Sequence, residues 1–216
     1  AEALSKICHK YNITLIEDAA ESIGSYYKHR HTGNTGQLAI LSFNGNKTIT
    51  TGGGGAVLTN DPELAKKAKH LTTTAKLPHR WEYIHDQVGY NYRLPNINAA
   101  LGCAQMEKLP NILDRKRKLA QRFSIVFSEV DGVSFFNEPE HCQSNFWLNT
   151  LVLDDNHSWD RDALLLSLND AGFMSRPAWR LASQLEMFMS SPQMNLDVSK
   201  DLLRRIICIP SSSTLS

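Results

Sequence analysis

Apolar and polar residues are distributed along the chain in patterns that predict helices and strands in alternation. Apolar residues recur at helical spacing from Ala3 to Tyr11. Short apolar runs at 12–16 and 38–43 are typical of buried strands, and a third run at 56–59 also predicts a strand. The polar, turn-rich stretch at 26–36 predicts a hairpin or an active-site loop. A helix that leads into a buried strand is typical of an α/β sheet.

Helices dominate the prediction for the middle of the chain. Asn60 can cap a helix that continues to about Leu71. A loop rich in His, Trp and Tyr follows at 78–92. Two further helices are then predicted, one at 96–109 and a basic, amphipathic one at 111–130.

The last part of the chain predicts a second, smaller α+β unit. A strand is predicted at 145–153, with alternation at Phe146, Leu148, Thr150 and Val152. Ser158 is expected to cap a helix that stops at Gly172. A short strand at 173–176 and a final helix at 197–207 complete the unit.

Two domains are therefore predicted, 1–115 and 116–216. The chain opens at Ala1 with no Met, no signal peptide and no helix cap, so it begins as if inside a helix. We expect that the front of the protein precedes Ala1.

Composition narrows the classes of function. The 216 residues hold 23 Lys and Arg against 22 Asp and Glu, a net charge of +1 that argues against nucleic-acid binding through broad positive charge. Hydrophobic residues make up 42%, as in ordinary globular chains, and no apolar run approaches the roughly 18 residues of a membrane span. The four scattered cysteines predict reduced, buried thiols of a cytosolic protein, with neither disulfides nor a zinc site. They are Cys8, Cys103, Cys142 and Cys208.

Three features could carry chemistry: Asp18 at a strand end, Lys47 in a loop after a strand, and the glycine run 52–55. Each is weak alone, because such residues commonly serve as caps, solvated side chains or flexible turns. The glycines are no phosphate-binding loop, since Lys47 precedes them. They precede a strand, which favours a tight backbone turn beside a ligand.

Together these features match the requirements of pyridoxal phosphate (PLP). A lysine amine forms a Schiff base with the aldehyde of PLP, and an aspartate keeps the pyridinium nitrogen protonated, which makes the ring an electron sink. Hydroxyl and backbone N–H groups can hold the phosphate.

The chain resembles a known family at several ordered sites. The segments are EDAAESIG at 17–24, SFNGNK at 42–47, TGGGG at 51–55, VGYNYRLP at 88–95 and NAALG at 98–102. They resemble the DegT/StrS-type PLP-dependent nucleotide-sugar aminotransferases. The resemblance implies an α/β PLP-dependent transferase of aspartate aminotransferase fold type I. This chain would be the C-terminal part of the PLP-binding large domain plus a small α+β domain.

The resemblance implies roles for individual residues. Lys47 matches the Schiff-base lysine, which also carries the proton between cofactor and substrate, and Asp18 matches the pyridinium partner. Ser42 matches the phosphate-binding serine. Asn91 matches the asparagine that reaches the cofactor phosphate of a neighbouring subunit, which implies a homodimer with shared active sites. Further cofactor-binding candidates are Asn44, Arg93 and Glu21.

Glu21 departs from the pattern of many relatives, which carry Gln or His at this position near the phenolic oxygen of the cofactor. A carboxylate there would repel the phenolate unless it is protonated or turned away.

The resemblance also implies a substrate class. The segments SFNGNK, TTTAK at 72–76 and SRPAW at 175–179 are most similar to enzymes that aminate C4 of UDP-linked 4-keto-6-deoxy sugars, a group that is perosamine-synthase-like in sequence. L-Glutamate would be the amino donor in a ping-pong reaction that serves bacterial glycan synthesis. Candidate substrate residues are His85, Tyr90, Arg176 and Trp179. The loop that holds His85 could equally be clamped on its own domain or on a partner, and Arg176 could be a surface strand end.

Three alternatives stay open: a non-catalytic PLP-fold relative, an inactive truncated remnant, and a sugar dehydratase of the same fold. Lys47 argues against the first and the last, because loss of the lysine is the simplest route to lost transamination and the dehydratases carry histidine in its place.

Overall fold

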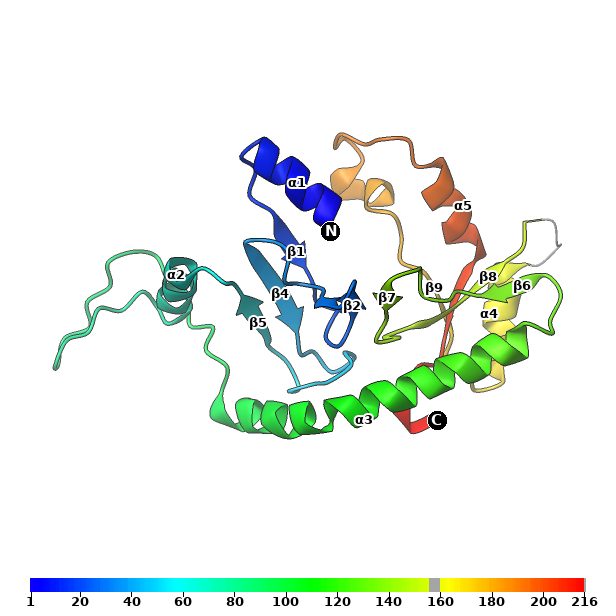
Figure 1. Ribbon diagram of the computed structural model, residues 1–216, viewed down its shortest axis with the longest axis horizontal. Coiled ribbons are helices and arrows are strands. Elements are labelled where there is room, and N and C mark those ends of the chain that lie inside the picture. Colours follow the sequence, from blue (N-terminus) through cyan, green and yellow to red (C-terminus); the bar gives the residue numbers. More distant parts are fainter. Residues whose placement is uncertain (156–159, 216) are drawn as a thin grey trace. The chain divides into compact units, whose positions relative to one another are not determined.

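The computed structural model describes residues 1–155 and 160–215. The chain divides into two compact units, each of which is described by itself (Figure 1). The first comprises Ala1–Ile112 and Glu140–Asn145, and the second comprises Leu113–Pro139 and Phe146–Ser216.

The first unit is an α/β structure built on two small sheets. Its elements are α1 (Glu2–Lys10), β1 (Ile16–Asp18), β2 (Tyr26–Tyr27), β3 (Arg30–His31), β4 (Leu38–Ser42), β5 (Gly55–Leu58), α2 (Pro62–Thr72) and β7 (Cys142–Gln143). One sheet has the order β1-β4-β5, with β1 parallel and β5 antiparallel to β4. The other has the order β3-β2-β7 and contains the hairpin predicted at 26–36.

Alternation along β4 shows which face of the first sheet is covered. Ala39 and Leu41 are buried in a core that also holds Ile49, whereas Ile40 between them is 48% exposed. Ile16 of β1 is 55% exposed as well. The prediction of buried strands is therefore wrong for one face: side chains of successive residues point to opposite faces, and only one face is covered within the described residues.

The N-terminus of α2 is capped by Asp61 and not, as predicted, by Asn60. The Asp61 Oδ1 accepts hydrogen bonds from the N–H groups of Glu63 at 2.8 Å and Leu64 at 3.2 Å. Asn60 instead donates to the Oδ1 of Asn34 at 3.0 Å.

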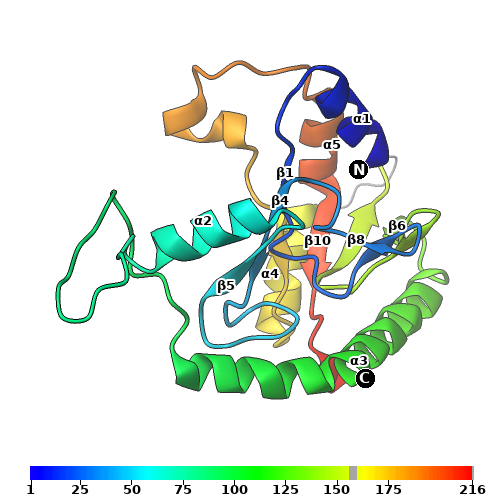
Figure 2. The ribbon, with the colours of Figure 1, turned by 60° about the vertical axis from the view of Figure 1, so that its left-hand side comes forward.

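The two helices predicted at 96–109 and 111–130 form one helix, α3 (Asn96–Phe127), which continues through Pro110 (Figure 1 and Figure 2). A proline inside a helix removes one backbone hydrogen bond. Apolar packing on both sides offsets this loss, because Ile112 packs on the core of the first unit and Ala120 on that of the second.

The second unit has a four-stranded antiparallel sheet of order β6-β8-β10-β9. Its elements after α3 are β6 (Val133–Phe135), β8 (Asn149–Leu153), α4 (Arg161–Asp170), β9 (Arg176–Pro177), η1 (Ala182–Gln184), η2 (Glu186–Phe188), α5 (Asp197–Arg205), β10 (Ile206–Ile209) and η3 (Ser213–Leu215). Phe135, Leu151 and Ile207 lie in its core.

Three predictions for this unit need correction. Residues 206 and 207, predicted as the end of a helix, begin strand β10, because the β-branched isoleucines of this strand complete the core between β8 and β9. Strand β8 buries Asn149, Leu151 and Leu153, the opposite face from the predicted alternation. Ser158 lies outside the described residues, and Asp160 caps α4.

All four cysteines are free, but the prediction that they are buried is wrong: Cys103 is exposed, and the other three, Cys8, Cys142 and Cys208, are half-buried. None of the helices in the described part of the chain is long and apolar enough to cross a membrane.

Candidate active site

The edge of the first sheet gathers the residues that the sequence singles out. Because β1 and β4 are parallel, their carboxyl ends, Asp18 and Ser42, lie at the same edge. Ser42 pairs with Gly55 of the antiparallel β5, so the glycine run ends at this edge too. Ligands of open α/β sheets bind at such carboxyl ends.

The side chains of Lys47 and Glu21 meet in this region. Lys47 follows a turn in which its N–H donates to the carbonyl of Asn44 at 3.0 Å. Its Nζ forms an ion pair with the Glu21 carboxylate. The Lys47 side chain is only 11% exposed, and that of Glu21 is 42% exposed. The departure from the family pattern at Glu21 therefore places a carboxylate on the amine of Lys47.

Asp18 and Ser42 present accessible oxygens at the edge. Asp18 is exposed, and its Oδ1 accepts a hydrogen bond from the N–H of Ala20 at 3.2 Å. The Oγ of Ser42 accepts from the N–H of Asn44 at 3.4 Å, and the Asn44 side chain donates to Asn46 at 3.2 Å. These hydrogen bonds lie within the loops and order them, and the Asp18 side chain stays exposed.

Sequence reasoning missed Glu17, which shapes the loop beside the site. Its carboxylate accepts hydrogen bonds from the N–H groups of Gly33 at 3.0 Å, Thr35 at 2.5 Å and Gly36 at 2.6 Å. Burial raises the pKa of Glu17, but these bonds and the nearby Arg30 outweigh it and hold the pKa below its usual value. The sequence does hold a signal for this role of Glu17: a carboxylate stands one residue before Asp18, and a glycine-containing turn follows at 33–36.

The backbone conformation and close packing of the run 52–55 require glycine at several of its positions. Gly52 and Gly54 have φ of +79° and +94°, which favour glycine. A Cβ on Gly55 would lie 2.3 Å from the carbonyl oxygen of Leu41, and one on Gly54 would lie 2.7 Å from Leu94 Cδ1. The run is thus a tight turn, as predicted, and it packs against Leu94 of the segment VGYNYRLP at 88–95.

The glycine run and the segment 92–95 line one hollow of about 450 Å³. Its lining residues are Gly53, Gly54, Gly55, Tyr92, Arg93, Leu94, Pro95 and Asn98. The Asn98 side chain donates to the carbonyl of Thr51 at 2.5 Å, which ties α3 to the glycine run. The structure thus brings Arg93 next to the end of β5, whereas the sequence only placed it in the same motif as Asn91.

Asn91 and Tyr90 lie on an exposed segment beside the end of α2. The N–H of Tyr90 donates to the carbonyl of Leu71 at 2.7 Å, and Asn91 pairs with Thr73. Both residues are exposed, so their side chains are available to a ligand or a second chain. His85 differs: its Nδ1 bonds the carbonyl of Thr74 at 2.7 Å, the contact expected of a loop clamped on its own domain.

Arg176 and Trp179 belong to the second unit. Arg176 is exposed in the short strand β9. The indole of Trp179 is stacked on that of Trp147, with ring centroids 5.7 Å apart and an interplanar angle of 8°. The first unit holds every other candidate residue.

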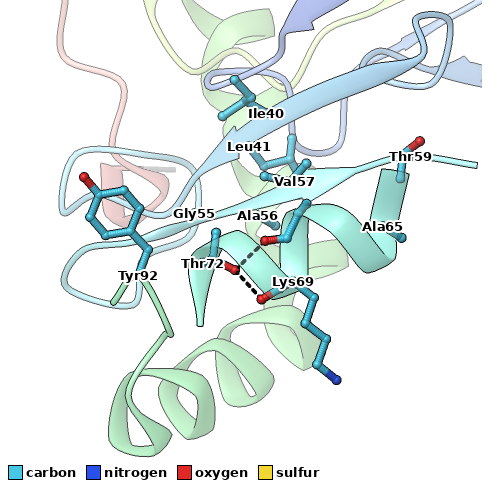
Figure 3. A pocket seen from close by; sticks show the side chains of 11 residues that line it. Ile40, Leu41, Gly55, Ala56, Val57, Thr59, Ala65, Lys69, Thr72 and Tyr92 are labelled. Atoms are coloured by element: carbon cyan, nitrogen blue, oxygen red, sulfur yellow. Dashed lines mark hydrogen bonds between the residues drawn. The ribbon is translucent and has the colours of Figure 1, made fainter. Parts of the chain in front are cut away.

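A second hollow, of about 460 Å³, lies between α2 and the exposed face of the sheet (Figure 3). Ile40, Val57, Thr72 and Tyr92 line it, and Lys69 is its charged residue. The Thr72 hydroxyl donates back to the carbonyls of its own helix. None of the candidate residues lines this hollow.

The fold is that of the PLP-dependent transferases of aspartate aminotransferase fold type I. A solved structure of Helicobacter pylori PseC, an aminotransferase involved in the biosynthesis of pseudoaminic acid, superposes with a TM-score of 0.93 at 24% identity, covering 100% of this chain and 58% of that one. The sequence pattern of the DegT/DnrJ/EryC1/StrS aminotransferase family matches residues 1–216. The chain belongs to that family.

Two curated relatives align with the whole chain. The putative pyridoxal phosphate-dependent aminotransferase EpsN of Bacillus subtilis is 37% identical over 220 residues, which are 100% of this chain and 56% of that protein. GDP-perosamine synthase of Escherichia coli O157:H7 is 34% identical over 215 residues, 100% of this chain and 57% of that protein. The chain therefore spans little more than half the length of these relatives.

Proposed function

We propose that the protein to which this chain belongs is a PLP-dependent aminotransferase that moves an amino group from L-glutamate to a 4-keto nucleotide-linked deoxy sugar, in the synthesis of bacterial amino-sugar glycans. The observation that carries the proposal is the ion pair of Lys47 and Glu21, set at the sheet edge that also presents Asp18 and Ser42. Membership of the aminotransferase family supports it.

The residues at the edge fit PLP. Lys47 offers an amine that is almost wholly shielded from solvent, and the exposed carboxylate of Asp18 can pair with a pyridinium nitrogen. The Ser42 hydroxyl, with Asn44 beside it, can bind the phosphate. When bound, PLP supplies an electron sink for the bond to the nitrogen-bearing carbon of the substrate.

The chain's own groups supply the proton transfers. Lys47 Nζ is the group that takes and returns a proton at the reacting carbon. A carboxylate beside an amine accepts its hydrogen bond and fixes its position, so Glu21 sets where the Lys47 amine is held. The shielding of Lys47 keeps water from competing for the proton.

The nucleotide-sugar class is supported by the names of the relatives. One is a GDP-perosamine synthase of Escherichia coli O157:H7. Another is a UDP-4-amino-4,6-dideoxy-N-acetyl-beta-L-altrosamine transaminase of Campylobacter jejuni, 33% identical over 172 residues, 79% of this chain and 46% of that protein. Lys47 favours transamination over the dehydratase alternative.

We further propose a cytoplasmic homodimer whose subunits share active sites. Support comes from the segment that holds Asn91 and Arg93, whose polar side chains are exposed beside large aromatic ones. Tyr83 is 79% exposed and Tyr92 is 72% exposed, which is costly for a monomer and typical of a surface that meets another chain.

The test uses the full-length protein that contains this chain. Borohydride reduction in the presence of PLP, followed by peptide mass mapping, is expected to find the cofactor attached to Lys47. Lys47→Ala should lose both the attachment and amino transfer from glutamate to a keto sugar. Lys118→Ala, at a side chain that is 66% exposed, is the matched control and should keep both. Amino transfer by Lys47→Ala at the wild-type rate would overturn the proposal.

A further inference from the structure

Asn145 is buried at the heart of the first unit although it comes from a distant part of the sequence. It is 3% exposed, and it ends the segment Glu140–Asn145, which returns to this unit after residues 113–139 have left it. Strand β7 anchors the segment, because Cys142 pairs with Tyr27 and Gln143 with Tyr26.

The Asn145 side chain links the two loops that carry the ion pair. Its Nδ2 lies 2.6 Å from the carbonyl oxygen of Glu21 and 3.0 Å from that of Ile23. The same nitrogen lies 3.2 Å from the hydroxyl of Thr48, the residue that follows Lys47. Two N–H groups therefore face three acceptors, and those acceptors flank both members of the pair.

The backbone of Asn145 adds a fourth link. Its N–H donates to the Oγ of Ser25 at 3.0 Å, which secures the far end of the Glu21 loop. A buried amide without its hydrogen bonds destabilises the folded state, so these four links hold the Glu21 loop in one arrangement. Neither loop has a regular secondary structure that would otherwise fix the separation of the two side chains.

We propose that Asn145 is a positioning residue of the active site: by joining the Glu21 backbone to the Lys47 loop, it holds the Glu21 carboxylate on the Lys47 amine. The inference deepens the proposed function and rests on it, because the pair is the part of the site whose geometry Asn145 sets. The side-chain bonds of Asn145 described above go to the backbone of the Glu21 loop and to Thr48, so Asn145 acts on the pair through Glu21.

The readout is the rate at which trace acetic anhydride acetylates Lys47 in the full-length protein at fixed pH, measured by peptide mass spectrometry. An amine held against a carboxylate in a side chain that is only 11% exposed reacts slowly, because the reagent must displace the carboxylate to reach it. Glu21→Gln should therefore speed the reaction. Asn145→Ala should speed it by about fivefold, the change that loss of one ordinary hydrogen bond makes to an equilibrium.

The double variant separates positioning from general loosening. If Asn145 acts through Glu21, Asn145→Ala adds nothing to the rate in the Glu21→Gln background. The matched control is Asn149→Ala, which removes an asparagine that is 1% exposed and donates to the carbonyl of Pro210 in the second unit. It should lower stability and leave the Lys47 rate unchanged.

The outcomes decide the inference. An unchanged Lys47 rate in Asn145→Ala, additive effects in the double variant, or no effect of Glu21→Gln would each overturn it. If Asn145→Ala does not fold, Thr48→Val takes its place, since it keeps the asparagine and removes only the link to the Lys47 loop. A smaller increase in the acetylation rate of Lys47 then supports the inference, and an unchanged rate overturns it. Borohydride attachment of PLP to Lys47 is scored separately, so failure of the proposed function is distinguishable.

Discussion

The carboxylate of Glu21 contacts the Nζ of Lys47, although 26 residues separate the two along the chain. The contact joins the loop after β1 to the loop after β4, and the parallel pairing of these strands places both loops at one edge. It gives the lysine a fixed charged partner in a place where only 11% of its side chain is exposed. The ion pair is thus a product of the strand order.

Glu21→Gln should lower kcat/KM of the full-length protein about tenfold. The amide keeps the shape of the side chain but loses the charge-assisted bond to Lys47, which is the stronger kind of hydrogen bond. Steady-state kinetics with glutamate and a keto sugar measure the effect. Glu129→Gln, at an exposed carboxylate, is the control and should match the wild type. Equal activity of both variants would show that the pair has no part in the reaction.

Glu17→Gln should destabilise the protein by about 1–3 kcal/mol at pH 7, because an amide cannot accept the three backbone N–H bonds as a carboxylate does. The folded-state pKa of Glu17 is lowered, so its contribution is fully present above the unfolded value of about 4.3 and is lost as pH falls through the folded pKa. Urea titrations should show the gap between wild type and variant narrowing in acid. A gap that is constant with pH would contradict this account.

Lys116 predicts a second rise of stability with pH, in an alkaline window rather than an acid one. It is 5% exposed, its Nζ donates to the carbonyl of Ser211 at 2.6 Å, and burial lowers its pKa to about 8. The folded state therefore binds fewer protons than the unfolded state between pH 8 and about 10.4, and stability rises across that window.

Lys116→Met should remove this rise, which amounts to about 3 kcal/mol at most. The measurement is the free energy of unfolding of both proteins at pH 7 and pH 10.5. Lys118→Met, on the same helix at a side chain 66% exposed and paired with Asp114, should retain the wild-type pH dependence. If the two lysine variants behave alike, the buried ammonium is not the cause.

The glycine run should split into tolerant and intolerant positions. A Cβ on Gly53 would meet nothing within 4 Å, and its φ is not positive, so Gly53→Ala should change stability by no more than about 0.5 kcal/mol. At Gly55 a Cβ would lie 2.3 Å from a backbone oxygen, and Gly55→Ala should cost about 1–3 kcal/mol. Thermal unfolding of the two variants makes the comparison. Equal costs would mean that the run is only a flexible linker.

Local patterns predicted the elements that carry the site. Strands at 38–43 and 56–59 and a helix ending near Leu71 correspond to β4, β5 and α2. Asp18 was predicted at a strand end and lies there, whereas Ser42, predicted inside a strand, is the last residue of β4. These features depend on residues close together in sequence, through side-chain periodicity and turn chemistry.

The errors arise where distant contacts decide. Pro110 predicted a break, but packing on both sides keeps α3 continuous. Residues 206–207 continued a helical pattern, yet they enter a sheet because β8 and β9 supply its ladder on both sides. Apolar residues on the outer face of β4 predicted that both faces of the strand are buried. Whether another element covers the outer face depends on tertiary packing, which the local sequence does not determine.

The sequence by itself determined the family, the fold class and the candidate lysine, because ordered motifs and periodicity are written in neighbouring residues. Only the tertiary structure decided that Glu21 meets Lys47, that Glu17 fastens the 33–36 turn and that Asn145 joins the two loops. Such contacts link positions that are far apart in the chain. Hydrogen bonds and ion pairs form only when two groups lie within a few ångströms of each other, and sheet pairing and burial bring these groups that close.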